Sequence, residues 1–134
     1  MSAAGAGAHL LDTHILLWAL REPERLSGPA RAAVLAGGNV LSVVSYWEVT
    51  IKSMKGLLDV GDPRAWWAEA LEKLVATALP LRHDHVGAVW ELPPIHKDPF
   101  DRILIAQAKV EGLALVSADA NVGRYGAAGV RVVR

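Results

Sequence analysis

The chain has 134 residues, 52% of them hydrophobic, which suits a single domain with a sizeable core. Its 14 basic and 14 acidic residues give a net charge of zero, so a global positive field is excluded and any nucleic-acid binding must use a local patch. The absence of cysteine excludes disulfides and thiolate metal sites, and no apolar run approaches the ~18 residues of a membrane span, so we expect a cytoplasmic protein.

Residues 1–8 lack the basic start and long apolar core of a signal peptide. We expect them to form a flexible N-terminal tail. Residues 9–134 contain no internal repeat, low-complexity tract or linker, so we expect a single domain there.

Two strands and three helices are expected in the first half of the chain. Short apolar runs bounded by turn residues are typical of central strands that are covered on both faces. The expected elements are a strand over residues 9–12, a short helix broken at Pro23, a helix over residues 28–36, a strand over residues 39–44, and a helix that ends at Gly56. This last helix is expected to begin at Ser45 and Glu48, which have the S-x-x-E spacing of a capping box.

Proline and glycine divide the second half of the chain. The expected elements are a helix from Asp62 to about Thr77, an extended piece over residues 79–81, a helix over residues 83–91, a helix over residues 99–111, a strand over residues 113–118, a helical turn over residues 120–124 and a strand over residues 130–133. Asp98 is expected to cap the helix that starts at Pro99, and Gly112 to end it. Strands separated by helices predict an α/β fold with a mainly parallel sheet.

The helix after Asp62 contains two adjacent tryptophans, which must point roughly 100° apart. Trp67 is expected to face the core, because it shares one side of the predicted helix with Leu71, Leu74, Val75 and Ala78. Trp66 is then the exposed one. It is either an anchor for a binding partner or a residue that closes the core under a neighbouring loop.

Four acidic residues are predicted to stand where a strand leads into a helix: Asp12, Glu48, Asp101 and Asp119. Such junctions line up at the carboxyl edge of a parallel sheet, so we expect the four carboxylates to share one cleft. Simpler explanations exist for two of them. Glu48 also suits a helix cap or an ion pair with Lys52, and Asp101 suits the positive end of a helix dipole.

Clustered carboxylates repel one another, and a hard cation such as Mg²⁺ or Mn²⁺ with oxygen ligands relieves the repulsion. Such an ion activates water and orients a phosphodiester, so the predicted chemistry is hydrolytic phosphodiester cleavage. We also expect neutralisation of Asp119 to relieve part of the repulsion in the absence of metal.

Four separated blocks of the sequence resemble a PIN domain: Leu11 to His14, Ser45 to Lys52, His96 to Ala108 and Leu115 to Asp119. More narrowly, the chain is similar to the VapC-type toxins of bacterial toxin–antitoxin pairs over almost all of residues 9–134. The resemblance implies a three-layer α/β/α sandwich and a Mg²⁺- or Mn²⁺-dependent endoribonuclease. It also implies an RNA substrate, inhibition by a cognate antitoxin protein, and assembly as a homodimer or a toxin–antitoxin hetero-oligomer.

The resemblance also assigns roles to individual residues. The family's acidic positions, which are both catalytic and metal-binding, match Asp12, Glu48, Asp101 and Asp119. Asp98 is better explained as a helix cap, and Ser117 keeps a hydroxyl where threonine is commoner. Asp98 and Ser117, together with Lys52 and Thr13, are accessory candidates.

Two alternatives come from other classes. A phosphoaspartyl phosphatase of the haloacid-dehalogenase type would have a second aspartate two residues after Asp12, where this chain has His14. A non-catalytic PIN-like module would bind RNA or antitoxin and would give no cleavage when Mn²⁺ is added. His14 and His96 are expected to be solvated or packed rather than catalytic, and Arg102 and Lys97 to be solvated rather than bound to RNA.

Overall fold

The computed structural model describes residues 7–134, so residues 1–6 of the tail expected at residues 1–8 lie outside the described residues. Ala8 already belongs to the core. The strands are β1 (His9–Leu11), β2 (Asn39–Ser42), β3 (Thr77–Leu79), β4 (Ala114–Val116) and β5 (Val132–Val133). The helices are α1 (Thr13–Arg21), α2 (Gly28–Leu35), α3 (Val43–Met54), α4 (Pro63–Lys73), α5 (His83–Val89), α6 (Pro99–Glu111) and α7 (Ala120–Gly123), with 3-10 helices η1 (Pro23–Arg25) and η2 (Arg124–Ala128).

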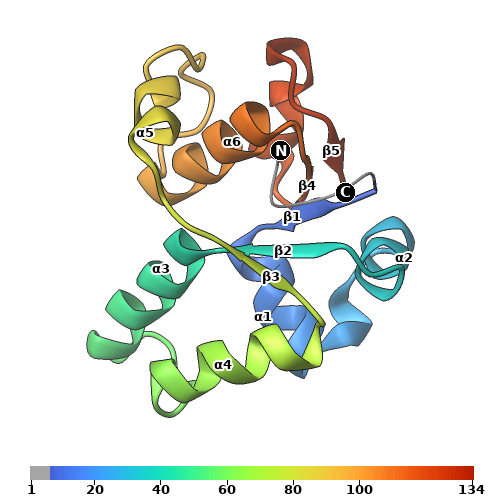
Figure 1. The fold of residues 1–134 in the computed structure, drawn as a ribbon, viewed down its shortest axis with the longest axis vertical. Coiled ribbons are helices and arrows are strands. Elements are labelled where there is room, and N and C mark those ends of the chain that lie inside the picture. Colours follow the sequence, from blue (N-terminus) through green and yellow to red (C-terminus); the bar gives the residue numbers. More distant parts are fainter. Residues whose placement is uncertain (1–6) are drawn as a thin grey trace.

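The five strands form one parallel sheet in the order β3-β2-β1-β4-β5 (Figure 1). The chain builds outward from β1 to β2 and β3, then adds β4 and β5 on the other side of β1. The strand order therefore reverses at β1. In parallel α/β sheets, ligands bind beyond the carboxyl ends of the strands where this reversal occurs.

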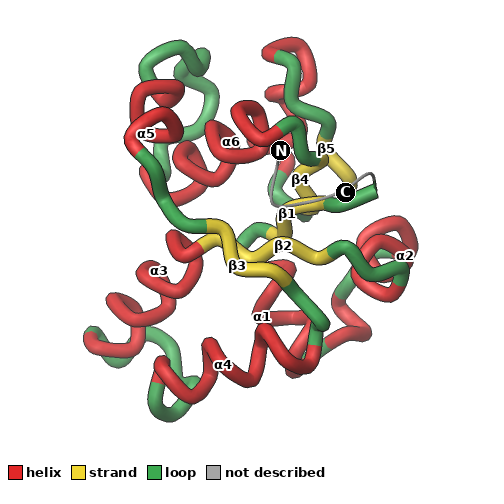
Figure 2. Tube along the Cα trace, viewed as in Figure 1, coloured by secondary structure: helices red, strands yellow, loops and turns green. Residues whose placement is uncertain are grey.

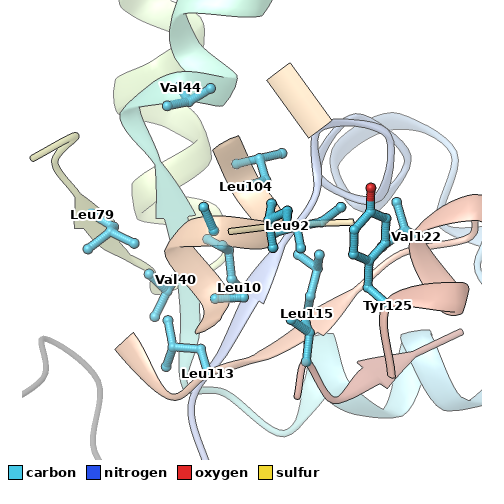
Figure 3. Packing of buried hydrophobic residues seen from close by; sticks show 14 of the residues in the cluster. Leu10, Val40, Val44, Leu79, Leu92, Leu104, Leu113, Leu115, Val122 and Tyr125 are labelled. Atoms are coloured by element: carbon cyan, nitrogen blue, oxygen red, sulfur yellow. The ribbon is translucent and has the colours of Figure 1, made fainter. Parts of the chain in front are cut away.

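Helices cover both faces of the sheet, so the predicted three-layer α/β/α sandwich is confirmed. Figure 2 shows the strands between α1 and α4 on one side and α6 on the other. The core beneath α6 and α7 includes Leu10, Val40 and Leu115 (Figure 3). The core beneath α1, α2 and α4 includes the next residue of each strand, Leu11, Leu41 and Val116. Alternation along each strand thus fills both cores, as the two-residue period of a strand requires.

The helix α6 has the limits that the sequence predicts, because both of its ends are specified locally. The Asp98 carboxylate accepts hydrogen bonds from the backbone N–H groups of Phe100 at 2.8 Å and Asp101 at 3.3 Å. Pro99 occupies the first helical position, where no N–H partner is needed. Gly112 ends the helix with φ 68°, a left-handed conformation that glycine adopts without strain.

The start of α3 differs from the prediction. The strand β2 ends at Ser42, whose hydroxyl accepts a hydrogen bond from the Val44 N–H at 3.0 Å and caps the helix. Because α3 therefore begins at Val43, the capping box predicted at Ser45 and Glu48 is wrong. Glu48 lies one turn further into the helix and is not needed to cap it.

The end of α4 also differs from the prediction, and this reverses the roles of the two tryptophans. Trp66 is buried, with 3% of its surface exposed, in the core beneath α4, and Ala70 lies beside it. Trp67 is only partly buried and stacks on Tyr46, with ring centroids 5.0 Å apart. The predicted exposure of Trp66 is wrong because α4 ends at Lys73, so several residues used to define its apolar face are not on the helix.

Among residues 7–134 the longest helix is α6, with 13 residues. A helix that crosses a bilayer needs about 20 apolar residues. No helix of the described chain is long and apolar enough for that.

Candidate functional site

Three of the four predicted acidic residues meet in one pocket at the carboxyl edge of the sheet. The pocket has a volume of about 240 Å³ and is lined by Asp12, His14, Trp18, Asp101, Ala118 and Asp119. Asp12 follows β1 and Asp119 lies just beyond β4, and these two strands are neighbours in the sheet. Asp101 reaches the pocket from the first turn of α6, after a loop rather than a strand. The prediction that every acid follows a strand is therefore wrong for Asp101, and also for Glu48 within α3.

Asp12 is held rigidly at the start of α1. Its Oδ1 accepts a hydrogen bond from the Ile15 N–H at 2.9 Å, and its side chain also bonds to the Ser117 hydroxyl. With 4% of its surface exposed, its carboxylate is deprived of water. Burial raises the pKa of Asp12, although these two hydrogen bonds and nearby His14 oppose the rise.

The pKa of Asp101 is also raised, well above that of an ordinary aspartate. Burial, followed by the negative charge of Asp98, raises its pKa from 3.8 to about 7, and the charges of Asp12 and Glu48 add smaller increments. Nearby His96 opposes the rise. The predicted carboxylates are thus close enough to influence one another, since Asp12 and Glu48 act on Asp101 and Asp119 acts on Asp12.

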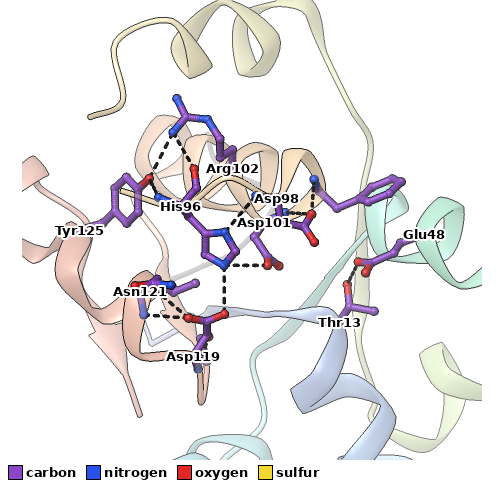
Figure 4. Close-up of polar contacts among 12 residues, drawn as sticks. Thr13, Glu48, His96, Asp98, Asp101, Arg102, Asp119, Asn121 and Tyr125 are labelled. Atoms are coloured by element: carbon purple, nitrogen blue, oxygen red, sulfur yellow. Dashed lines mark hydrogen bonds and ion pairs between the residues drawn. The ribbon is translucent and has the colours of Figure 1, made fainter. Parts of the chain in front are cut away.

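His96 lies between two of the carboxylates (Figure 4). Its Nε2 is 3.0 Å from an Asp101 oxygen and 3.0 Å from an Asp119 oxygen. Its Nδ1 accepts a hydrogen bond from the Asp98 N–H at 3.1 Å, so the ring proton of the neutral imidazole is on Nε2. His96 therefore donates to the two carboxylates. His96 is packed, as one of the two expected outcomes, and its packing places it between the site carboxylates.

Asp119 differs electrostatically from Asp101. Burial by itself would raise its pKa, but the hydrogen bond from His96 and those from the first turn of α7 outweigh burial and lower the pKa. Its Oδ1 accepts the Asn121 N–H at 2.7 Å (Figure 4). The buried Ser117 hydroxyl accepts the Asp119 N–H at 3.1 Å and also bonds to Asp12, so this accessory candidate connects the two acids.

Arg102 and Tyr125 hold the segment that carries His96. The Tyr125 hydroxyl accepts the His96 N–H at 2.9 Å and donates to the Pro93 carbonyl at 2.9 Å. Arg102 donates to the carbonyls of Pro93 and His96 and to the Tyr125 hydroxyl. Arg102 is thus neither a free surface charge nor available to RNA, whereas Lys97 is exposed as expected. The local sequence gave no signal for this frame, because Tyr125 is 29 residues from His96.

Glu48 lies beside the pocket and is bound by two accessory candidates. Thr13 donates to its Oε1 at 2.7 Å, and Lys52 donates to its Oε2 at 2.7 Å. The hydrogen bond to Glu48 raises the pKa of Lys52. The ion pair that the i, i+4 spacing predicts is present. Glu48 is 3% exposed, so its carboxylate is shielded from bulk water, and it is near enough to Asp101 for its charge to raise the pKa of that residue.

The donor atoms suit a hard divalent cation. Among the described residues, His96, Asp101 and Asp119 each offer an atom within 4.8 Å of the others. Nε2 of His96 carries a proton in this tautomer, so the available ligands are carboxylate oxygens, which Mg²⁺ and Mn²⁺ prefer. The Oδ1 of Asp98 accepts a hydrogen bond at the start of α6, and the negative charge of Asp98 raises the pKa of Asp101.

The fold and the site define an α/β domain with an acidic, metal-binding type of pocket where its parallel strand order reverses. The chain belongs to the PIN domain family, whose sequence model matches residues 9–128. The resemblance seen in the four sequence blocks is thereby confirmed.

Known proteins agree with this assignment. Ribonuclease VapC22 of Mycobacterium tuberculosis is 28% identical over 111 residues, which cover 82% of this chain and 85% of that protein. VapBC2 from Rickettsia felis, solved with a DNA fragment from its promoter, has a TM-score of 0.66 and 12% identity over 93% of this chain and 96% of that chain. FitAcB from Neisseria gonorrhoeae has a TM-score of 0.63 and 21% identity over 93% of this chain and 96% of that chain. At these identities the two structures establish a common fold.

Proposed function

We propose that this protein is a divalent-metal-dependent endoribonuclease and the toxin of a toxin–antitoxin pair. The observation that carries the proposal is the convergence of Asp12, Asp101 and Asp119 in one pocket of a PIN domain, with the pKa of Asp101 raised to about 7. Carboxylates that are both buried and close to other negative charges favour a bound cation, which stabilises their ionised form. The relative named ribonuclease VapC22 supports RNA as the substrate.

In this proposal Asp12, Asp101 and Asp119 hold Mg²⁺ or Mn²⁺, with Glu48 beside them. The ion supplies Lewis-acid chemistry that activates water and stabilises the charge that develops on the phosphodiester. The protein contributes orientation: α1 and Ser117 hold Asp12, and His96 holds Asp101 and Asp119 together. Thr13 and Lys52 fix both oxygens of Glu48, and Lys52 also balances its charge.

The proposed protein partner is an antitoxin. Similar structures are described as VapBC from Rickettsia felis and as VapBC-5, a member of a family of toxin–antitoxin systems, from Mycobacterium tuberculosis. A short reading frame beside the one that encodes this chain is the natural candidate. Its product is expected to bind this protein and to suppress RNA cleavage when the two are mixed, as measured in the same cleavage assay. Assembly as a homodimer or a hetero-oligomer is part of this proposal.

The test is cleavage of a pool of cellular RNAs by the purified protein, with and without Mg²⁺ or Mn²⁺, followed by mapping of the new ends. Asp12→Asn is expected to lower metal-dependent cleavage by roughly 100-fold or more, because it removes a ligand charge worth several kcal/mol. Asparagine is also a good N-cap, so α1 should still form.

Asp62→Asn is the matched control. Asp62 caps α4 through the Arg64 N–H at 2.9 Å, so the same chemical change is made at a helix cap that does not line the pocket. Its cleavage rate should equal that of the wild type. Undiminished cleavage by Asp12→Asn would contradict the assignment. Binding of RNA or antitoxin by a wild-type protein that cleaves nothing with either metal would favour the non-catalytic module.

A further inference from the structure

A second concave region adjoins the carboxylate pocket. It has a volume of about 540 Å³ and is lined by His14, Leu17, Trp18, Arg21, Glu22, Arg25, Lys52, Leu57, Leu58 and Val60. We refer to it as the α1 groove. His14 and Trp18 line both the groove and the carboxylate pocket. The two cavities therefore share a wall, and a chain that leaves the pocket on this side enters the groove.

Positive charge collects in the α1 groove although the whole chain is neutral. Arg21, Arg25 and Lys52 line it, and Glu22 is the one carboxylate in the lining; Lys52 is paired with Glu48 at 2.7 Å, so the two arginines supply the charge that a ligand can meet. Arg25 pairs with Glu22 at 3.2 Å, but both side chains are about half exposed, so water screens the pair. Arg21 is exposed and uses one N–H on the Asp59 carbonyl at 2.9 Å. Among residues 7–134 its other N–H groups have no hydrogen-bond acceptor, so they can bind an anion.

The groove also carries flat side chains beside these cations. The Arg25 guanidinium lies over the Trp18 ring, 4.5 Å from its centroid. The His14 ring lies on the pocket side, with its centroid 6.0 Å from that of Trp18. Aromatic rings and guanidinium planes are the surfaces on which unpaired bases stack in RNA-binding proteins.

We infer that the α1 groove binds the single-stranded RNA segment next to the bond that is cleaved, with a base stacked against the Trp18–Arg25 pair and phosphates on Arg21 and Arg25. This inference rests on the proposed ribonuclease function and assigns the binding of the strand to Trp18, Arg21 and Arg25. A duplex keeps its bases stacked on one another, so it presents no free base to Trp18. The residues that bind the RNA strand thus lie directly beside the carboxylate pocket.

The experiment measures binding separately from cleavage. A fluorescein-labelled oligoadenylate, alone or annealed to oligouridylate, is titrated with Asp12→Asn protein in the absence of divalent ions, and anisotropy is recorded at several salt concentrations. We expect the single strand to bind more tightly than the duplex. In the Asp12→Asn background, Trp18→Leu should weaken single-strand binding about tenfold, and Trp18→Phe should retain most of it because a ring remains for stacking. Since Trp18 is partly buried, circular dichroism must show that each variant is folded.

The double change Arg21→Gln with Arg25→Gln should reduce the slope of log K against log salt by about 1.4, the value for two phosphate contacts on a single strand. The matched control is Arg31→Gln with Lys73→Gln, which removes two cations from a separate cavity between α2 and the end of α4 and should leave affinity and slope unchanged.

Equal binding of duplex and single strand, or groove variants that bind RNA like their parent, would overturn the inference. So would variants that lose antitoxin binding alone, which would assign the groove to the antitoxin. Wild-type protein that cleaves no RNA would instead defeat the proposed function, and the binding measurements would still report on the groove.

Discussion

The protonation of Asp101 depends strongly on its surroundings. Its side chain is 18% exposed, and burial together with Asp98 raises its pKa to about 7 in the folded protein. In the unfolded chain the pKa is near 3.8. Folding therefore tightens proton binding to Asp101, so stability falls as the pH rises from about 4 to about 7, and the full cost is present above that range.

Asp101→Asn is expected to stabilise the metal-free protein at neutral pH and to give no such gain at pH 4. One pKa unit corresponds to about 1.4 kcal/mol, so the gain is at most about 4 kcal/mol, and partial solvent exposure reduces it. Urea denaturation of both proteins across the pH range, in chelator-treated samples, measures the difference. Stability curves that stay parallel from pH 4 to 8 would refute this account.

Asp119→Asn provides a contrast at the same site. The pKa of Asp119 is lowered in the folded state, so its ionised form contributes stability above its unfolded pKa, and this contribution is lost as the pH falls through the folded pKa. Neutralisation at Asp119 is therefore expected to destabilise the protein at neutral pH. This reverses the sequence-based expectation that Asp119 is the carboxylate to neutralise, because His96 and the first turn of α7 stabilise its charge.

At the scale of elements, α4 ends in a strained conformation. Val75 follows the helix with φ 47°, a left-handed conformation that a β-branched residue rarely adopts. Its side chain is 84% exposed, so it contributes little packing there. The Val75 N–H donates to the Glu72 carbonyl and the Ala76 N–H to the Leu71 carbonyl, a helix ending for which glycine is usual.

Val75→Gly is expected to stabilise the protein by about 1 kcal/mol. It removes a left-handed strain of roughly 1–2 kcal/mol, and the greater conformational entropy of glycine in the unfolded chain offsets part of this gain. Val75→Ala is the matched control. It removes the branched side chain and keeps Cβ, so it should increase the free energy of unfolding much less than Val75→Gly does. Denaturant midpoints of the three proteins test this, and equal gains for glycine and alanine would mean that Cβ strain is not the cause.

At the scale of the whole molecule, the site carboxylates come from three distant parts of the chain: Asp12 after β1, Asp101 in α6 and Asp119 beyond β4. An ion bound to all three would hold these parts together. Saturating Mg²⁺ or Mn²⁺ is therefore expected to raise the melting temperature. An ion that binds only the folded state contributes about 2.7 kcal/mol at 100 times its dissociation constant. Calorimetry of metal-free protein, with NaCl at matched ionic strength as the control, measures the effect.

Asp101→Asn should show a smaller metal-dependent shift than the wild type, because it lacks one proposed ligand and has less repulsion to relieve. Melting curves that are the same with and without the divalent ion would favour a pocket of ordinary acids that binds no metal.

Local signals in the sequence determined the parallel α/β fold, the limits of α6 and the positions of Asp12 and Asp119. Each depends on neighbours a few residues away: an apolar run that needs cover on both faces, a carboxylate that accepts the next turn's N–H groups, and a proline or glycine at a helix end. These preferences act within a turn or a strand, so they can be recognised without the rest of the molecule.

Only the tertiary structure decided which tryptophan of α4 is buried. It also decided that Glu48 lies beside the pocket and does not cap α3, and that His96 lies between Asp101 and Asp119. The partners in these cases come from distant parts of the chain: Glu48 meets Thr13, 35 residues away, and His96 meets Asp119, 23 residues away. The physical reason is that side-chain pairing across a sheet edge depends on where helices end and how they pack. Because α4 ends at Lys73, the apolar residues beyond it do not define its buried face, which contains Trp66 and Ala70.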